Sequence, residues 1–167
     1  MYPLLTCRRA ADFQHMSQRG MDAIVAGARA LQRDAGSGGV PPLLRGRYIG
    51  LMSDTIDNDE ARLFTCAATE LGARVAHIVP TLSDSSTEDE VRRTARMLGR
   101  LYDAVACQDT AHDLVEQLAD AAGVPIYEGI SSAQHPTARL ADLLDGDWST
   151  KDKRKFVIQA LLVGSIP

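Results

Sequence analysis

Short apolar runs alternate with helical segments along residues 46–145, and this alternation constrains the fold more than any other feature of the chain. Each of four runs has the length and composition of a buried strand, and each is followed by helical spacing. The predicted strands cover residues 48–52, 75–79, 104–107 and 125–127, and the predicted helices cover residues 57–71, 88–100, 109–122 and 136–144. Strands and helices that alternate in this way form a parallel sheet with right-handed crossovers and helices on both faces.

Two further helices are expected outside these βα units. In residues 10–33, apolar side chains recur every three or four positions, which predicts a helix with one buried face, and the Gly- and Pro-rich segment 34–42 ends it. Residues 154–163 are apolar at nearly every position from Phe156 onward and follow a polar linker at 145–153. Periodicity does not separate a buried helix from a strand in this last segment.

We therefore expect an α/β fold: a single three-layer domain with a four-stranded parallel sheet flanked by helices, plus N- and C-terminal helices. A chain of 167 residues can bury one core but is too short for two α/β domains. The formal net charge is -4, with acidic and basic residues interleaved, which argues against a nucleic-acid or membrane partner. The longest apolar run, residues 156–163, is far below the ~20 residues of a membrane span.

The cysteines and the first residues bear on the compartment. Cys7, Cys66 and Cys107 form an odd set without CxxC spacing, and two of them fall in predicted core elements, which predicts reduced, buried thiols. Residues 1–5 lack the charged start and long apolar core of a signal peptide. Both observations favour a cytoplasmic protein.

The segment after the fourth predicted strand carries the most specific motif. Residues 123–126 (Gly-Val-Pro-Ile) lead through a short polar loop to His135-Pro136-Thr137 and then to the apolar residues 140–144. This pattern resembles the His-Pro-(Thr/Cys)-Gln helix start of the aspartate and ornithine carbamoyltransferases. The ornithine branch fits better, because residues 94–104 are similar to its helix-to-strand segment and residues 67–75 to its first helix and second strand. The resemblance runs from about Gly46 to Leu144, the carbamoyl-phosphate domain of that family.

The resemblance also implies an organisation. Residues 1–145 correspond to the carbamoyl-phosphate domain, with the helix at 10–33 and the βα units at 46–145. Residues 146–167 then form a linker and a helix similar to the family's final helix, packing back on the same domain. We expect the amino-acid-binding domain between these segments to be missing. Because the carbamoyl-phosphate domain builds the family's trimer, we expect a homotrimer, or association with a full-length carbamoyltransferase.

The site that the resemblance implies is altered in this chain. A phosphate dianion needs helix N–H groups and guanidinium groups, which the family supplies from a Ser-Thr-Arg-Thr-Arg motif. The matching positions here are Asp57, Asn58, Asp59, Glu60 and Ala61. Asp57 or Asn58 can cap the helix, and the acids complement its dipole.

Four more positions of the family site can be matched. The arginine after the third strand is replaced, within one residue, by Gln108, and the glutamine of the His-Pro motif is replaced by Ala138. His135, which in the family helps to polarise the carbamoyl carbonyl, is kept together with Thr137.

These replacements lead to two hypotheses. The first is a degenerate carbamoyltransferase-like protein, inactive in carbamoyl transfer, that acts as a binding or assembly subunit. The alternative is a small related enzyme that uses His135 and the acidic loop on an amino acid or amine. Residues 57–60 also fit a solvated, self-capping helix start, and His135 a remnant that holds its loop. We expect no cofactor and no metal site, because nothing resembles a Ser-His-Asp set, a zinc site or a P-loop.

Overall fold

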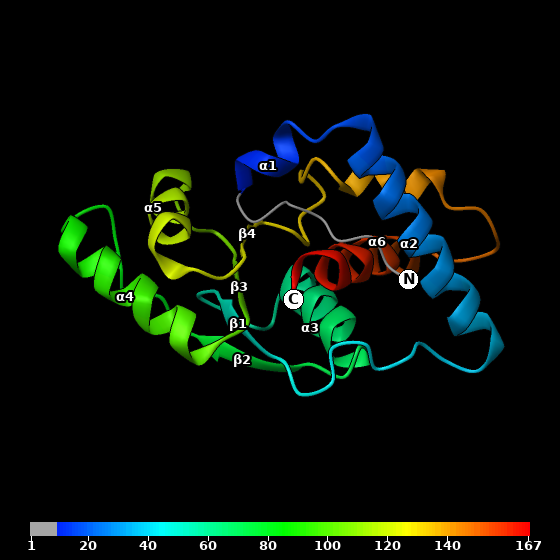
Figure 1. The fold of residues 1–167 in the computed structure, drawn as a ribbon, viewed down its shortest axis with the longest axis horizontal. Coiled ribbons are helices and arrows are strands. Elements are labelled where there is room, and N and C mark those ends of the chain that lie inside the picture. Colours follow the sequence, from blue (N-terminus) through cyan, green and yellow to red (C-terminus); the bar gives the residue numbers. More distant parts are fainter. Residues whose placement is uncertain (1–9) are drawn as a thin grey trace.

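A computed structural model describes residues 10–167 of the chain (Figure 1). The elements in chain order are α1 (Ala10–Gln14), α2 (Gln18–Ser37), β1 (Tyr48–Met52), α3 (Asp59–Glu70), β2 (Arg74–Ile78), α4 (Glu88–Leu101), β3 (Ala104–Cys107), α5 (His112–Ala122), β4 (Ile126–Glu128), the 3₁₀ helix η1 (Ala138–Leu143) and α6 (Thr150–Ser165). The four strands form one parallel sheet in the order β2-β1-β3-β4. The predicted α/β class and the four-stranded parallel sheet are confirmed.

Helices cover both faces of the sheet and bury two separate apolar clusters. Residues that neighbour each other along a strand point to opposite faces, so Leu51 joins one cluster and Met52 the other. The larger cluster contains apolar side chains of α2, α3, η1 and α6, and the smaller one those of α4 and α5. In Figure 1, α4 and α5 lie on one side of the strands, and α2, α3 and α6 on the other. The arrangement is the three-layer one expected from the alternation.

The C-terminal helix is part of the larger cluster. Helix α6 packs against α2, α3 and η1, and Figure 1 shows it between α2 and α3. Phe156, Leu161 and Leu162 are fully buried in the same cluster as Ile24 and Ala28 of α2. The helix begins earlier than residue 154, because the Ser149 hydroxyl accepts a hydrogen bond from the Asp152 N–H and caps it there. Elements from the two ends of the described chain therefore share one core.

The single helix predicted over residues 10–33 is wrong. The structure has two helices, α1 and α2, with a break at residues 15–17. Ser17 is extended at its backbone and its side chain accepts the Gly20 N–H at 3.2 Å, so a second helix begins there with its own cap. Helix α2 then continues to Ser37, where Gly38 at φ 145° takes a conformation open to glycine and ends it.

The helix predicted over residues 136–144 is also wrong. The chain turns through residues 135–137 and then forms the 3₁₀ helix η1. Thr137 provides no side-chain cap, and the ladder is of the i+3 type, as in the Leu140 N–H to Thr137 O bond of 3.0 Å. Side chains three apart align in a 3₁₀ helix, so Ala141 and Leu144 fall on one buried face. Burial against α2 and α6 has overridden the local helix signal.

The cysteines are only partly as expected. Cys107 is buried on β3, whereas Cys66 is exposed on α3, because it falls outside the helix face that packs on the sheet. Cys7 lies outside the described residues. Among residues 10–167, no helix is long and apolar enough to cross a membrane.

Candidate functional site

The predicted site residues follow β1, β3 and β4 at the carboxyl edge of the sheet. The strand order reverses between β1 and β3, because β1 connects onward to β2 on one side and β3 to β4 on the other. Open α/β sheets bind ligands in the crevice outside such a reversal. Residues 57–60 follow β1, Gln108 follows β3, and His135 and Thr137 follow β4. The topology therefore brings the predicted residues to one edge of the molecule.

The loop from β1 to α3, which we call the acidic loop (residues 53–60), is held by its own hydrogen bonds. The buried Ser53 hydroxyl donates to the Thr55 carbonyl at 2.7 Å, and the Asp57 N–H donates to the Thr55 hydroxyl at 3.1 Å. Asn58 is the helix cap, since its Oδ1 accepts the Ala61 N–H at 2.7 Å. The Ala61 N–H, which could otherwise donate to an anion at this helix start, is therefore already bonded to Asn58.

The carboxylates of the acidic loop point to solvent or into a pocket. Asp57 and Asp59 are exposed and Glu60 is half-buried. Asp57 reaches Arg62 only at 4.0 Å, and both side chains are exposed, so this ion pair adds little to stability. Three acidic side chains around one helix start make the local potential unfavourable for a phosphate dianion and favourable for a cation.

Gln108 is buried at the end of β3. It is 3% exposed, and its Nε2 donates to the Ser131 hydroxyl at 2.9 Å. Within residues 10–167 its Oε1 is buried and has no hydrogen-bond partner. The next residue, Asp109, has φ 52°, a left-handed conformation that is uncommon outside glycine and that sharply turns the chain after β3. Gln108 thus connects β3 to the loop after β4.

A pocket of about 290 Å³ lies between the starts of α3 and α6. Asp59 and Glu60 line it from α3, and Lys151 and Arg154 line it from α6, with Ser131 at its wall. The Arg154 guanidinium donates to the Ser131 carbonyl. Sequence reasoning missed Lys151 because it placed that residue in a linker, and it gave Arg154 no role in the site. The structure adds two cations to the predicted acids.

His135 is held as a neutral imidazole. The ring is 8% exposed and packs edge-on against Phe13, with 5.4 Å between ring centroids. Its Nδ1 accepts the Thr137 N–H at 3.3 Å and lies 2.7 Å from the Thr137 hydroxyl, which fixes the proton on Nε2. Burial lowers the pKa of His135 to about 4. At neutral pH the side chain can therefore donate a hydrogen bond without carrying charge.

His135 lines a second pocket, of about 230 Å³, that shares no lining residue with the first. Gln14, Glu128 and Ser132 contribute to its wall. Glu128 lies 2.8 Å from His112 Nδ1, and this carboxylate raises the pKa of the exposed His112 imidazole. The predicted site is thus divided: Asp59 and Glu60 line one pocket and His135 lines the other, with Ser131 in the first wall and Ser132 in the second. Thr137 lines neither pocket and acts only by holding His135.

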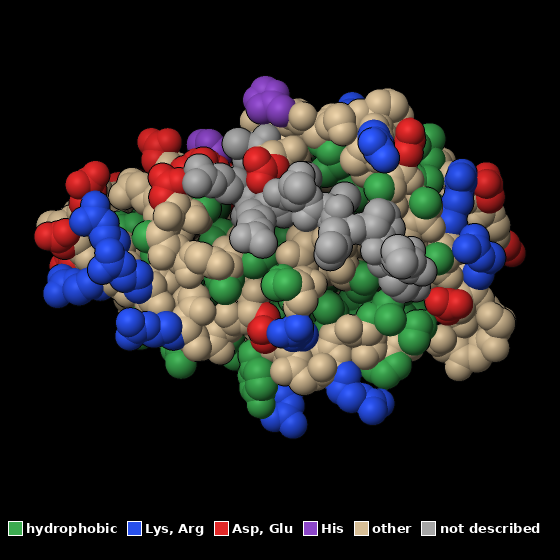
Figure 2. All heavy atoms as spheres, viewed as in Figure 1, with side chains coloured by type: hydrophobic (Ala, Val, Ile, Leu, Met, Phe, Trp, Pro, Cys, Tyr) green, Lys and Arg blue, Asp and Glu red, His purple; other side chains and the backbone are tan. Residues whose placement is uncertain are grey.

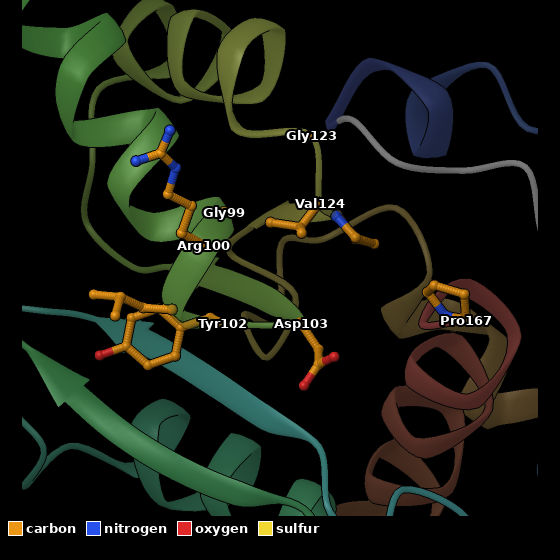
Figure 3. A pocket seen from close by; sticks show the side chains of 9 residues that line it. Gly99, Arg100, Tyr102, Asp103, Gly123, Val124 and Pro167 are labelled. Atoms are coloured by element: carbon orange, nitrogen blue, oxygen red, sulfur yellow. The ribbon is translucent and has the colours of Figure 1, made fainter.

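A third pocket, of about 300 Å³, lies at the opposite, amino edge of the sheet (Figure 3). Its one acidic side chain, that of Asp103, is already bound by the Arg47 guanidinium at 3.0 Å and the Tyr48 N–H at 2.8 Å. The described residues contain no group of three or more His, Cys, Asp or Glu side chains that could hold a metal ion. The carboxyl edge is therefore the candidate site.

Comparisons with known proteins agree with the resemblance seen in the sequence. Residues 8–145 match the family model described as "Aspartate/ornithine carbamoyltransferase, carbamoyl-P binding domain". A catabolic ornithine carbamoyltransferase of Burkholderia mallei is 35% identical over 130 residues, which are 78% of this chain and 39% of that protein. An ornithine carbamoyltransferase of Haemophilus influenzae is 32% identical over 137 residues, 82% of this chain and 41% of that protein.

Solved structures show the same fold. The ornithine carbamoyltransferase from Pyrococcus furiosus superposes with a TM-score of 0.71 at 24% identity, over 86% of this chain and 45% of that one. One from Gloeobacter violaceus gives 0.60 at 27% identity, over 84% and 44%. The chain spans about two fifths of the length of the curated relatives named above, 39% and 41%. It belongs to the aspartate/ornithine carbamoyltransferase family, and the part that matches is the domain described as binding carbamoyl phosphate.

Proposed function

We propose that this chain is a binding and assembly protein of the carbamoyltransferase family that does not itself transfer carbamoyl groups. The observation that carries the proposal is the start of α3, where Asp57, Asp59 and Glu60 surround the helix N-terminus and Asn58 Oδ1 takes the Ala61 amide. A charge-assisted contact to phosphate is worth ~1.5–3 kcal/mol, so the loss of the arginines that the resemblance implies removes several powers of ten in affinity.

The test is to titrate carbamoyl phosphate into the protein by calorimetry and to assay transfer to ornithine and aspartate. We expect no saturable binding in the micromolar range and no product above background. A Kd in the low micromolar range, or turnover with either amino acid, would remove the proposal. The double variant D59N/E60Q sharpens it, because relief of the acidic potential should raise a weak affinity for phosphate at least severalfold.

The assembly part of the proposal is supported by the outer face of α4. Met97 and Leu101 are more than half exposed, and they line a shallow groove of about 330 Å³ together with Arg93, Arg96 and Arg100. Figure 2 shows Lys and Arg side chains gathered over α4 at the left of the molecule. Exposed apolar side chains within a charged rim are typical of a surface that contacts protein.

We propose a homotrimer, or a mixed assembly with a full-length carbamoyltransferase. Light scattering at tens of micromolar should give three times the mass of the chain, and M97E/L101E should give a monomer that keeps its circular dichroism. A wild-type monomer that also fails to co-elute with a full-length carbamoyltransferase would exclude both assemblies. We further propose a cytoplasmic location, because the chain has an odd number of cysteines without CxxC spacing.

A second candidate function is an enzyme that acts on an amino acid or amine, and the His135 pocket favours it. The fixed Nε2–H of His135 and the Glu128 carboxylate line the same pocket and offer a donor and an anionic acceptor. Incubation with amino acids and amines, with and without carbamoyl phosphate, should give a new product by mass spectrometry. The product must disappear in H135N if this candidate holds.

A further inference from the structure

We infer that the pocket between the starts of α3 and α6 binds a zwitterionic amino acid, with its ammonium at Asp59 and Glu60 and its carboxylate at Arg154 and Lys151. The inference rests on the binding role proposed above and names the ligand class of that site. Two of the four charged residues, Lys151 and Arg154, lie on α6 and are not part of the motif after β1 on which the proposed function rests. Two acids stand on one wall of the pocket and two bases on the other.

The four charges are kept apart. Within residues 10–167, none of Asp59, Glu60, Lys151 and Arg154 forms an ion pair with another of the four. Four residues further along α6 and ten further along α3, the opposite holds, since Lys155 Nζ of α6 lies 2.9 Å from Glu70 of α3. Helices α3 and α6 can therefore close an acid–base contact where they pack. At their N-terminal ends they leave a pocket between unlike charges, as a bridging zwitterion requires.

The cationic wall suits a carboxylate. Arg154 uses one nitrogen to hold the Ser131 carbonyl, which fixes the guanidinium at the pocket wall. A guanidinium has five N–H donors in a planar fork, so donors remain for a second acceptor, and bidentate pairing with a carboxylate is the geometry it favours. The start of α6 adds a positive end potential at the same wall.

The charge balance distinguishes a zwitterion from the single-charge alternatives. A free amine would leave Arg154 and Lys151 facing its alkyl part, and a simple anion would lie against Asp59 and Glu60. Each of these ligands would remove water from one pair of charged side chains without supplying an opposite charge, which is costly. An amino acid satisfies both walls, and a pocket of about 290 Å³ holds one.

A buried polar chain stands behind the pocket. The Ser131 hydroxyl at the wall accepts from Gln108 Nε2, and Gln108 Oε1 has no partner among the described residues. A buried acceptor left unpaired is costly, because it has lost its bonds to water without replacement. The Gln108 Oε1 can therefore accept a further hydrogen bond. Gln108 does not line the pocket itself, but its hydrogen bond to the Ser131 hydroxyl fixes the orientation of Ser131 at the pocket wall.

The experiment is a thermal-shift screen of the twenty standard L-amino acids and L-ornithine at 10 mM, followed by calorimetry on the strongest. We expect at least one to raise the melting temperature by several degrees. The amide of that amino acid, which lacks the carboxylate, and its N-acetyl derivative, which lacks the ammonium, should each bind at least tenfold more weakly.

Variants locate the binding. R154Q and D59N should each weaken the calorimetric Kd of that amino acid at least tenfold. K153Q and D54N remove the same charges from neighbouring positions that do not line the pocket, and they should leave the Kd within twofold. Circular dichroism melts confirm that all four variants fold.

Four results would overturn the inference. They are no shift with any of the twenty-one amino acids, an amide that binds as tightly as the parent, an N-acetyl derivative that does so, and equal losses in R154Q and K153Q. Carbamoyl phosphate binding in the same screen would instead count against the proposed function. The two failures are therefore distinguishable.

Discussion

The loop after β1 and the loop after β4 lie at the same edge of one sheet, yet they hold their polar side chains in opposite ways. The acidic loop is exposed and satisfies itself through short local bonds, with Asn58 as its cap. In the loop after β4 the side chains of Ser131, His135 and Thr137 are buried, and the Thr137 N–H fixes the proton of His135 on Nε2. Exposed local bonding tolerates exchange of side chains, whereas buried pairing does not.

The largest effect is expected from removing the support that both loops share. Helix α6 carries Arg154, which holds the Ser131 carbonyl, and it buries Phe156, Ile158 and Leu161 at ~1.5–3 kcal/mol each. Such a sum is a large part of a marginal stability of ~5–15 kcal/mol. We therefore predict that deletion of residues 151–167 abolishes cooperative thermal unfolding. An unchanged melting temperature would show that residues 146–167 are not an integral part of this domain.

The next effect tests the buried loop. H135A leaves the Thr137 N–H and hydroxyl without their partner and removes the ring from Phe13, so we predict a loss of about 2–4 kcal/mol in urea unfolding. H135N keeps an acceptor near the Nδ1 position and should recover about half of that loss. Equal stability of H135A and the wild type would show that the buried contacts of His135 contribute no more to stability than the exposed contacts of the acidic loop.

The pH dependence of the free energy of unfolding reports the burial of His135 in the wild-type protein. The pKa of His135 is about 4 in the folded protein, below the ~6.5 of an unfolded chain, so below pH 6.5 the unfolded state binds the extra proton. The stabilisation from the neutral ring is complete above pH 6.5 and is lost as pH falls toward 4. We predict about 2 kcal/mol lost between pH 7.5 and pH 5, relative to H135N. The raised pKa of His112 acts in the opposite sense, and H112N serves as the control.

The smallest effects belong to the acidic loop. N58A removes the cap that accepts the Ala61 N–H and should cost about 1 kcal/mol, while D57N should stay within about 0.5 kcal/mol because its ion pair with Arg62 is long and exposed. Differential scanning calorimetry resolves both. A larger loss in D57N than in N58A would mean that the carboxylate, and not the cap, holds the loop.

The sequence predicted the sheet better than the ends of the chain, for a physical reason. Strands 48–52 and 104–107 were located to the residue, because short apolar runs between turn residues have few alternatives in an α/β chain. The break at Ser17 was missed because a local cap, in which the Ser17 hydroxyl accepts the Gly20 N–H, lies inside a segment of continuous helical periodicity. The 3₁₀ helix η1 was missed because its burial against α2 and α6 depends on contacts far along the chain.

The candidate site was predicted in its residues but not in its grouping. Asp59, Glu60 and His135 were named, and the structure separates them into two pockets. Lys151 and Arg154 meet Asp59 only through the packing of α6 on α3. Whether these residues line one pocket depends on where the terminal helix α6 packs. Periodicity in a helix that is apolar at almost every position does not specify that docking.

The packing of α6 beside α2 has a consequence for how the chain can be extended. Between η1 and α6 the chain makes a turn whose residues 145–147 are exposed, and it leaves and re-enters the same layer there. The Arg29 guanidinium and the Gln32 amide of α2 hold the Leu143 and Asp145 carbonyls at the edge of this turn. The family match ends at residue 145. The turn is thus a permissive insertion point, at which a folded module can be added while both apolar clusters stay closed.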